Sequence, residues 1–201
     1  MVWPVVSCSR MKTYWQGGAS FSMSATTDSV SHEFRKATMA DWDVIQGIYA
    51  HARRLMAANG NPTQWAGGFP RPDVVRRDIE HGWMTVLVDH QGEQGAERIL
   101  AVFSICPGVD PTYVTIDGAW LDDDEYVTLH RIASSGLVKG VADEVFDWVM
   151  SRHSNVKVDT HPNNKAMQHV ITSNGFTRCG FIKLIDRPSD IIRIAYQRHD
   201  K

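Results

Sequence analysis

The sequence predicts an α/β domain whose sheet is antiparallel at first and becomes parallel around one glycine-rich turn. Three observations support this prediction. Short segments of alternating or β-branched apolar residues are separated by segments in which apolar residues recur every three or four positions. The expected order is β-α-α-β-β-β-α-β-α-β-β, which is typical of α/β proteins. The chain has 201 residues, of which 43% are hydrophobic, enough for one core of ordinary size.

Composition excludes several classes of protein. The formal net charge is −2 and the sequence pI is near 6.5, so we expect no general attraction to nucleic acid or to an anionic membrane. No stretch approaches the roughly 20 apolar residues that a membrane span needs. Cys8, Cys106 and Cys179 are too few and too scattered for a disulfide framework or a zinc ribbon. We therefore expect a reduced, cytoplasmic protein without a metal site.

Residues 1–31 are predicted to be an N-terminal extension or linker, and residues 32–201 the domain. The apolar run Val2 to Val6 is short, contains Pro4 and follows no basic region, unlike a signal peptide. Residues 17–31 are rich in Ser, Thr, Gly and Ala, which bury little surface.

The first half of the domain is predicted to contain a strand, two helices and a hairpin. Thr38 and Asp41 resemble a capping box, and the helix that follows ends at Asn59 and Gly60. Pro72 suits the first turn of a second helix. The expected elements are a strand at 32–38, a helix from 42 to about 60, a helix from 72 to about 80, and hairpin strands at 83–90 and 98–106.

The second half is predicted to alternate strands and helices around the turn in "IASSGLVKGVADEVFDWV". Valines at spacings of three and four give the helix after the turn one apolar face. Asn174 and Gly175 close the next helix. The expected elements are a strand at 126–135, a helix beginning near 140, a strand at 156–160, a helix at 163–175, and strands at 176–185 and 191–198.

The turn contains Gly136, Lys139 and Gly140 between a strand and a helix. Unpaired backbone N–H groups and the positive end of a helix dipole suit a pyrophosphate, and glycine lets the ligand approach closely. A tight connection that holds no ligand is the alternative. The sequence contains neither G-x-x-x-x-G-K-[ST] nor G-x-G-x-x-G after the first strand, so P-loop and Rossmann sites are not expected.

The sequence around this turn resembles the GNAT family of N-acetyltransferases. The family's acetyl-CoA loop reads Q/R-x-x-G-x-G/A, and "LVKGVA" matches at Gly140 and Ala142 but has Leu137 at the first position. Downstream, "DTHPNNKAMQHVITSNGF" resembles the next family segment, with Asn164 at the place of the family's Asn and a closing Gly-Phe. "QWAGGFP" and "HRIASS…DTHPNN" are similar to a bacterial subgroup whose acceptor is undefined. The resemblance covers residues 33–198.

The resemblance implies the GNAT fold, an α/β fold with a mixed, mostly antiparallel sheet, splayed fourth and fifth strands, and helices on both faces. It also implies an N-acetyltransferase domain over residues 32–201 that uses acetyl-CoA. The pantetheine arm would then pair with backbone of Ile132, Ala133 and Ser134, and one N–H group would polarise the thioester carbonyl, a contact worth about 3 kcal/mol. The pyrophosphate would lie on Leu137, Val138, Lys139, Gly140, Val141 and Ala142. Asn164 would bind pantetheine, cap a helix, or do both.

The acetyl transfer that the resemblance implies needs a base for the amine. His130 is the first candidate, because it lies on the strand that would hold the thioester. Strand alternation would place Thr128, His130 and Ile132 on one face, and if that face is core, His130 is a buried histidine. Asp159 and His161 are the second candidates, with the alternative roles of a loop cap and an exposed histidine.

The residue expected to protonate the leaving thiolate differs from the family pattern. The family often has Tyr seven residues beyond the Asn, and this chain has Ile171 there. The hydroxyl that protonates the thiolate could instead come from Tyr126, Ser173 or Tyr196, or the thiolate leaves unassisted. A non-catalytic acyl-CoA-binding or regulatory module on the same fold is the alternative function.

The acceptor is expected to be a primary amine of a small molecule or peptide. Trp65, Phe69 and Trp120 lie beside glycines in loops and are candidate pocket walls. The acidic run 122–124 is either a solvated turn or an attraction for a cationic amine. The resemblance leaves a homodimer open. A cysteine hydrolase using Cys106 or Cys179 is a further class, although no local signature places a base beside either thiol.

Overall fold

The computed structural model describes residues 31–201; the predicted linker, apart from residue 31, and Cys8 lie outside the described residues. The helices and strands are β1 (Glu33–Lys36), α1 (Trp42–Ala58), α2 (Pro72–Glu80), β2 (Met84–Asp89), β3 (Arg98–Pro107), β4 (Ile116–Gly118), β5 (Val127–Ser134), α3 (Val141–Met150), β6 (Asn155–Thr160), α4 (Lys165–Ser173), β7 (Thr177–Lys183) and β8 (Ile192–His199). The predicted elements are confirmed within a few residues. The prediction missed β4, a three-residue strand.

One eight-stranded sheet runs through the molecule in the order β1-β2-β3-β5-β6-β8-β7-β4. Neighbouring strands are antiparallel except β5 and β6, which are parallel. The expected change from antiparallel to parallel pairing is therefore confirmed, and it occurs at the strand that leads into the glycine turn.

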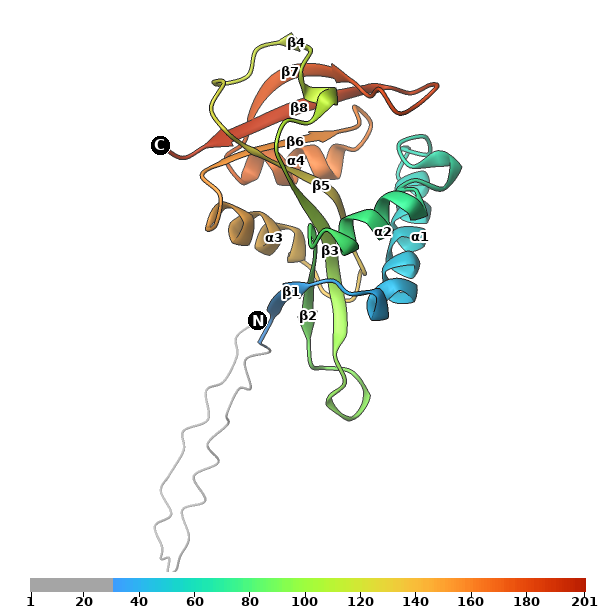
Figure 1. Ribbon diagram of the computed structural model, residues 1–201. Coiled ribbons are helices and arrows are strands. Elements are labelled where there is room, and N and C mark those ends of the chain that lie inside the picture. The colour runs from blue at the N-terminus through green and yellow to red at the C-terminus, as the bar shows by residue number, and fades with distance from the viewer. Residues whose placement is uncertain (1–30) are drawn as a thin grey trace, which may run out of the picture.

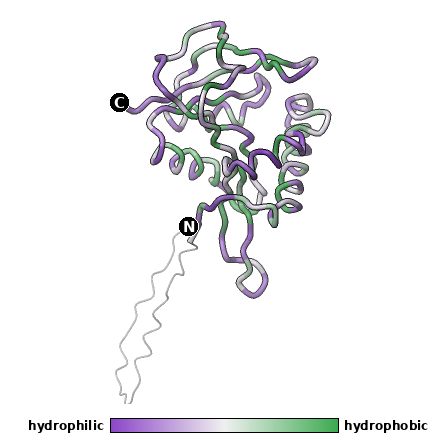
Figure 2. The backbone as a smooth tube through the Cα atoms, in the orientation of Figure 1, coloured by the Kyte–Doolittle hydropathy of each residue, from purple (hydrophilic) through white to green (hydrophobic). Residues whose placement is uncertain are grey.

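The helices cover both faces of the sheet, as Figure 1 shows for α1 and α2 against α3. One face forms a core in which α3 residues such as Val145 and Phe146 pack with Leu129 and Val156 of the sheet. The other face forms a second core around α1 and α2, in which Tyr49 is fully buried. Figure 2 shows the same division: hydrophobic residues lie along the central strands, and the loop between β2 and β3 is mostly hydrophilic.

The predicted capping box at the start of the first helix is present. The Thr38 backbone N–H donates to the Asp41 carboxylate at 2.8 Å. A short 3₁₀ turn precedes α1, so the α-helix proper begins at Trp42 rather than directly after Thr38. None of the helices within residues 31–201 is both long enough and apolar enough to cross a bilayer.

β5 contains a bulge that corrects one expectation. Val102 of β3 pairs with Ala133, but Ser104 pairs with His130, so β5 has one residue more than its partner here. Arg131 takes a left-handed φ of 58° at this point. Because the bulge reverses the alternation, Ile132 packs in the same core as Leu129. The prediction that Ile132 shares a face with His130 is therefore wrong.

Candidate functional site

The glycine turn presents free backbone amides at the start of α3. Gly140 is the N-cap residue with φ of 81°, and α3 begins at Val141. The Ser134 and Ser135 hydroxyls accept the N–H groups of the two residues that open the turn, at 3.1 and 3.4 Å. Among residues 31–201, no acceptor lies on the N–H groups of residues 138–142.

The space in front of this turn is open. A Cβ atom added to Gly140 would meet no atom of the described residues within 4 Å, so the space beside Gly140 is open there. Leu137, Lys139 and Gly140 are exposed, while Val138 packs partly against the core of the α3 face. Val141 is buried, and Ala142 is partly buried. The turn therefore has the open, main-chain character that an anion site needs.

Beside the turn, the parallel strands part. β5 and β6 pair at only two positions, Val127 with Val156 and Thr128 with Lys157. Beyond these pairs, residues 129–134 of β5 have no partner on the β6 side within the described chain, although β3 still pairs on the other side. Ile132, Ala133 and Ser134 therefore lie along an open strand edge. The predicted splay of these two strands is confirmed.

A cluster of polar side chains lies where the two strands separate. Asp110 Oδ2 lies 2.8 Å from His130 Nε2, and Asp159 Oδ1 lies 3.9 Å from His130 Nδ1. Tyr113 donates its hydroxyl to Asp159 at 2.7 Å, and the Tyr126 hydroxyl accepts the Asp110 backbone N–H at 3.2 Å. We call these five residues the histidine cluster. It joins the three predicted catalytic residues, His130, Asp159 and Tyr126, to two that sequence reasoning missed.

The histidine cluster is partly withdrawn from water but still reachable. The side chains of His130, Asp110 and Asp159 are 18%, 20% and 12% exposed. Burial alone would raise the pKa of Asp110, but hydrogen bonds from His130 and Thr112 outweigh it and leave that pKa below its usual value. Asp110 is therefore an ionised partner for the imidazole at neutral pH.

The two tyrosines of the histidine cluster remain protonated. Burial, with Asp159 nearby, raises the pKa of Tyr113 well above its usual value. Burial also raises the pKa of Tyr126. Both hydroxyls can therefore act as hydrogen-bond donors, although Tyr113 already donates to Asp159.

The other candidate acids lie elsewhere. Ile171 is fully buried in the core, which explains an apolar residue at that position. Ser173 donates to the Val170 carbonyl within α4, and Tyr196 packs in the core of the α3 face. Of the three hydroxyls considered from the sequence, Tyr126 is the one within the histidine cluster.

Asn164 and His161 lie beyond the end of β6. The Asn164 side chain accepts the Met167 N–H at 3.2 Å and so caps α4, while its Nδ2 donates to Gln64 Oε1 at 3.0 Å. The capping role is confirmed, and the pantetheine contact stays a prediction. His161 is buried rather than exposed, and its Nε2 lies 2.8 Å from Asp190 Oδ1.

The predicted pocket aromatics occupy different surroundings. Trp65 packs edge-on against Tyr49, with ring centroids 5.6 Å apart, and lines a pocket of about 140 Å³ formed by the end of α1 and the loop that follows it. The Phe69 ring lies beneath the Arg187 guanidinium, 3.9 Å away. The Trp120 ring packs at a tilt against that of Tyr113, with centroids 5.3 Å apart, and its Nε1–H donates to the Tyr113 carbonyl. Trp120 thus supports the loop that carries Tyr113.

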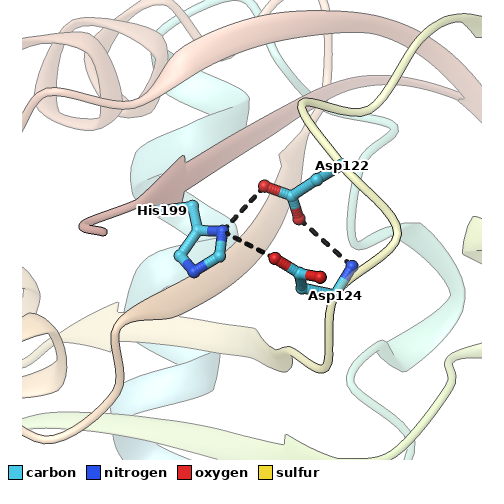
Figure 3. A group of neighbouring side chains, drawn as sticks. All are labelled: Asp122, Asp124 and His199. Carbon is cyan, nitrogen blue, oxygen red and sulfur yellow. Dashed lines mark hydrogen bonds and ion pairs between the residues drawn. The ribbon is translucent and has the colours of Figure 1, made fainter.

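The acidic run is not simply a solvated turn. Asp122 is 15% exposed and lies 2.7 Å from His199 Nδ1, and Asp124 lies 3.8 Å from the same nitrogen (Figure 3). These three side chains are close enough together to hold a metal ion, which the sequence did not predict. Lys201 Nζ lies 3.7 and 3.9 Å from the two carboxylates, and it can neutralise them without an ion.

Neither cysteine in the described chain has the properties of a nucleophile. Burial raises the pKa of Cys106 to about 11, and burial also raises the pKa of Cys179. Both are therefore thiols at neutral pH, which argues against the cysteine hydrolase alternative.

The fold is similar to that of known acetyltransferases, and one of them is also similar in sequence. A GNAT-family acetyltransferase from Streptococcus agalactiae is 28% identical, with a TM-score of 0.72 over 85% of this chain and 96% of that one. One from Listeria monocytogenes is 17% identical, with a TM-score of 0.61 over 86% and 97%. A phosphinothricin acetyltransferase from Sinorhizobium meliloti, solved with acetyl-CoA, is 14% identical, with a TM-score of 0.54 over 84% and 88%.

No protein-family model matches the sequence, and no curated protein is significantly similar to it. The assignment therefore depends on the structural similarities, the parted strands and the open turn before α3. By these criteria the chain has the fold of the GNAT-family acetyltransferases, and its sequence is similar to that of one of them.

Proposed function

We propose that the protein is an N-acetyltransferase that moves the acetyl group of acetyl-CoA to a primary amine of a small molecule or peptide by direct attack. The observation that carries the proposal is the parting of β5 and β6 beyond Thr128, between the open amides of the glycine turn and the histidine cluster. The similarity to the Streptococcus agalactiae acetyltransferase supports it.

The residues present fit acetyl-CoA. The turn offers amides that have no acceptor among residues 31–201, and open space beside Gly140, as a pyrophosphate requires. The free edge of residues 132–134 can pair with an extended amide-containing arm. When bound, acetyl-CoA supplies an acetyl group activated as a thioester. A backbone N–H on the free edge would polarise its carbonyl.

His130 is the base in this proposal, and Asp110 positions it. An ionised Asp110 accepts a hydrogen bond from His130 Nε2–H at 2.8 Å, which leaves Nδ1 as the acceptor nitrogen. Nδ1 lies 3.9 Å from Asp159 Oδ1, so the carboxylate and the nitrogen together can receive and stabilise an ammonium group. Loss of a proton to Nδ1 would then give the neutral amine that attack requires.

Tyr126 is the acid in this proposal. Its hydroxyl accepts the Asp110 N–H, so its own hydrogen remains available for the departing thiolate. Trp65 and Phe69 would contribute to the acceptor side through the loop between α1 and α2. Trp120 would act by supporting Tyr113.

The test is stabilisation by acetyl-CoA, followed by an amine screen read through thiol release. Gly140→Glu should abolish the acetyl-CoA-dependent rise in melting temperature, because it places bulk and negative charge where the pyrophosphate would lie. Gly140→Asn is the matched control, since Asn tolerates a left-handed φ without adding charge. An unchanged shift in Gly140→Glu would contradict the placement of the cofactor.

A non-catalytic acyl-CoA-binding module is the second candidate. Leu137 and the buried Ile171 favour it, because both replace polar residues of the family pattern. Stabilisation by acetyl-CoA without thiol release across a broad amine panel would support the module, and amine-dependent release would exclude it.

A further inference from the structure

Two arginines lie near the C-terminal end of β6, one of the two parted strands. Arg193 is on β8, and Arg187 is on the loop between β7 and β8. This loop meets the loop between α1 and α2, because Arg187 Nη1 donates to the Gln64 carbonyl and the guanidinium lies 3.9 Å from the Phe69 ring centroid. The arginines therefore border the side of the molecule on which we place the acceptor.

Both guanidinium groups carry buried donors without an acceptor. Arg193 is 2% exposed, and its Nη1 donates to the carbonyls of Asp190 and Ile192 at 2.7 Å. Its Nη2 is buried and has no partner among residues 31–201. Arg187 Nε is buried and unpartnered in the same sense. A buried donor of a charged group without an acceptor costs free energy, so each such donor calls for an explanation, and a bound group is one.

Within the described chain, Arg193 forms one long ion pair with a carboxylate but no hydrogen bond to one. The carboxylate recorded nearest to it is that of Asp190, with Oδ1 3.9 Å from Nη1. The carboxylate of Asp190 lies 2.8 Å from His161 instead. Burial lowers the pKa of Arg187 and of Arg193, and Asp159 offsets part of this effect at Arg193. The planar fork of a guanidinium matches the two oxygens of a carboxylate, so the free donors are suited to a carboxylate supplied from outside.

The arginines also adjoin the histidine cluster. Ala195 pairs with Asp159 across the β6–β8 ladder, and Arg193 lies two residues from Ala195 on the same strand face. Asp159 lies 3.9 Å from His130 Nδ1, where the amine would be deprotonated. A molecule with an amine and an acid a few bonds apart could therefore reach both places.

We propose that Arg193 and Arg187 bind a carboxylate of the acceptor while its amine lies at His130 and Asp159. The acceptor is then an amino acid or a related amine that carries an acidic group. This inference rests on the proposed acetyltransferase function and specifies the substrate class of the same site.

The test compares acids with their neutral counterparts. The probes are the L-α-amino acids with their α-carboxamides, and β-alanine and γ-aminobutyrate with alkylamines of equal length. The wild-type kcat/KM for the best acid should exceed that for its neutral counterpart about 10- to 100-fold, the range expected for charged hydrogen bonds. Arg187→Gln should remove most of this ratio, because it removes the donors that would distinguish an acid from its neutral counterpart. Arg178→Gln, an exposed arginine on β7, is the matched control.

A binding measurement covers the case of weak turnover. The same acids should raise the melting temperature of the CoA-saturated wild type but not that of Arg187→Gln or Arg193→Gln, and the carboxamides should not. Because Arg193 is buried, the melting curve of its variant without ligand must first show a folded protein. Arg187→Lys keeps the charge but not the planar fork, so it tests whether the fork is needed for stabilisation by the acids.

Three results would overturn the inference. They are equal use of acids and neutral amines, a ratio that survives in Arg187→Gln, and no stabilisation by any acid in a protein that acetyl-CoA stabilises. Failure of acetyl-CoA itself to stabilise the protein would instead contradict the proposed function, so the two failures are distinguishable.

Discussion

Asp78→Ala should destabilise the protein by about 3–5 kcal/mol, because it leaves a buried arginine without its counter-charge. Asp78 on α2 is fully buried, and its Oδ2 accepts a hydrogen bond from Arg131 Nε at 2.6 Å. Arg131 is the bulge residue of β5, and its side chain is 16% exposed. The ion pair therefore joins α2 to the strand that would hold the thioester.

The magnitude follows from what remains around Arg131 after the substitution. Its other side-chain partner is Cys106 Sγ at 3.2 Å, and sulfur is a weak acceptor. A loss of about 3–5 kcal/mol is a large part of the roughly 5–15 kcal/mol that stabilises a typical domain. For a domain of this size it should lower the melting temperature by about 6–20 °C.

The assay is a double-mutant cycle by urea unfolding, with Arg131→Met as the second single variant. The double variant should lose about 0.5–3 kcal/mol less than the sum of the two single variants, because neither charge is then left unpaired. Acetyl transfer should fall in Asp78→Ala even where the protein is folded, since the bulge sets the free edge of residues 132–134. A coupling energy below about 0.5 kcal/mol would refute the reasoning.

Four further predictions follow from named contacts. His130→Gln should reduce acetyl transfer at neutral pH more than at high pH, because a deprotonated amine needs no base; a uniform loss across the pH–rate profile would indicate altered packing instead. Hydrogen bonds from Arg98 lower the pKa of Asp89 to about 2, so the stability that this pair contributes above about pH 4 should be lost between about pH 4 and pH 2, and acid unfolding of Arg98→Met should lack that component. Tyr49→Phe removes a hydroxyl that donates to the carbonyl of the bulge residue at 3.1 Å and should cost about 1 kcal/mol in urea unfolding. With its pKa near 11, Cys106 should be alkylated by iodoacetamide at pH 8 far more slowly than a free thiol, as mass spectrometry would record.

Much of the fold could be predicted because its elements carry strong periodic patterns. The valines of α3 and the glycines before it indicated both the helix and the turn that begins it. His130 and Asp159 could be proposed because each lies on a strand whose ends were readable from sequence. Their proximity follows from the parallel register, in which Thr128 pairs with Lys157 and the next residues on the same face are His130 and Asp159.

The bulge at Arg131 could not be predicted from local sequence. A non-glycine residue with φ of 58° has no local signature, and it is held by tertiary contacts with Tyr49 and Asp78. These contacts hold the bulge, and the bulge reverses the alternation of side chains along β5. This explains why the predicted face of Ile132 was wrong. Sequence patterns report the average geometry of a strand, and this strand departs from the average where the thioester would lie.

Asp110 and Tyr113 were not predicted for a different reason. Both lie on a loop whose far end is held at a distant edge of the sheet. The loop begins after β3 and ends at β4, which pairs with β7. A Cβ on Gly118 would lie 2.2 Å from the Cys179 carbonyl oxygen, and one on Gly180 would lie 2.2 Å from that of Asp117.

The edge strand β4 can pair this closely with β7 only if both positions are glycine. The sequence near His130 gives no sign of the contact between Gly118 and Gly180. With the loop fixed at both ends, its middle brings Asp110 and Tyr113 to the gap between β5 and β6. The orientation of the proposed base therefore depends on a backbone contact at the opposite end of the sheet.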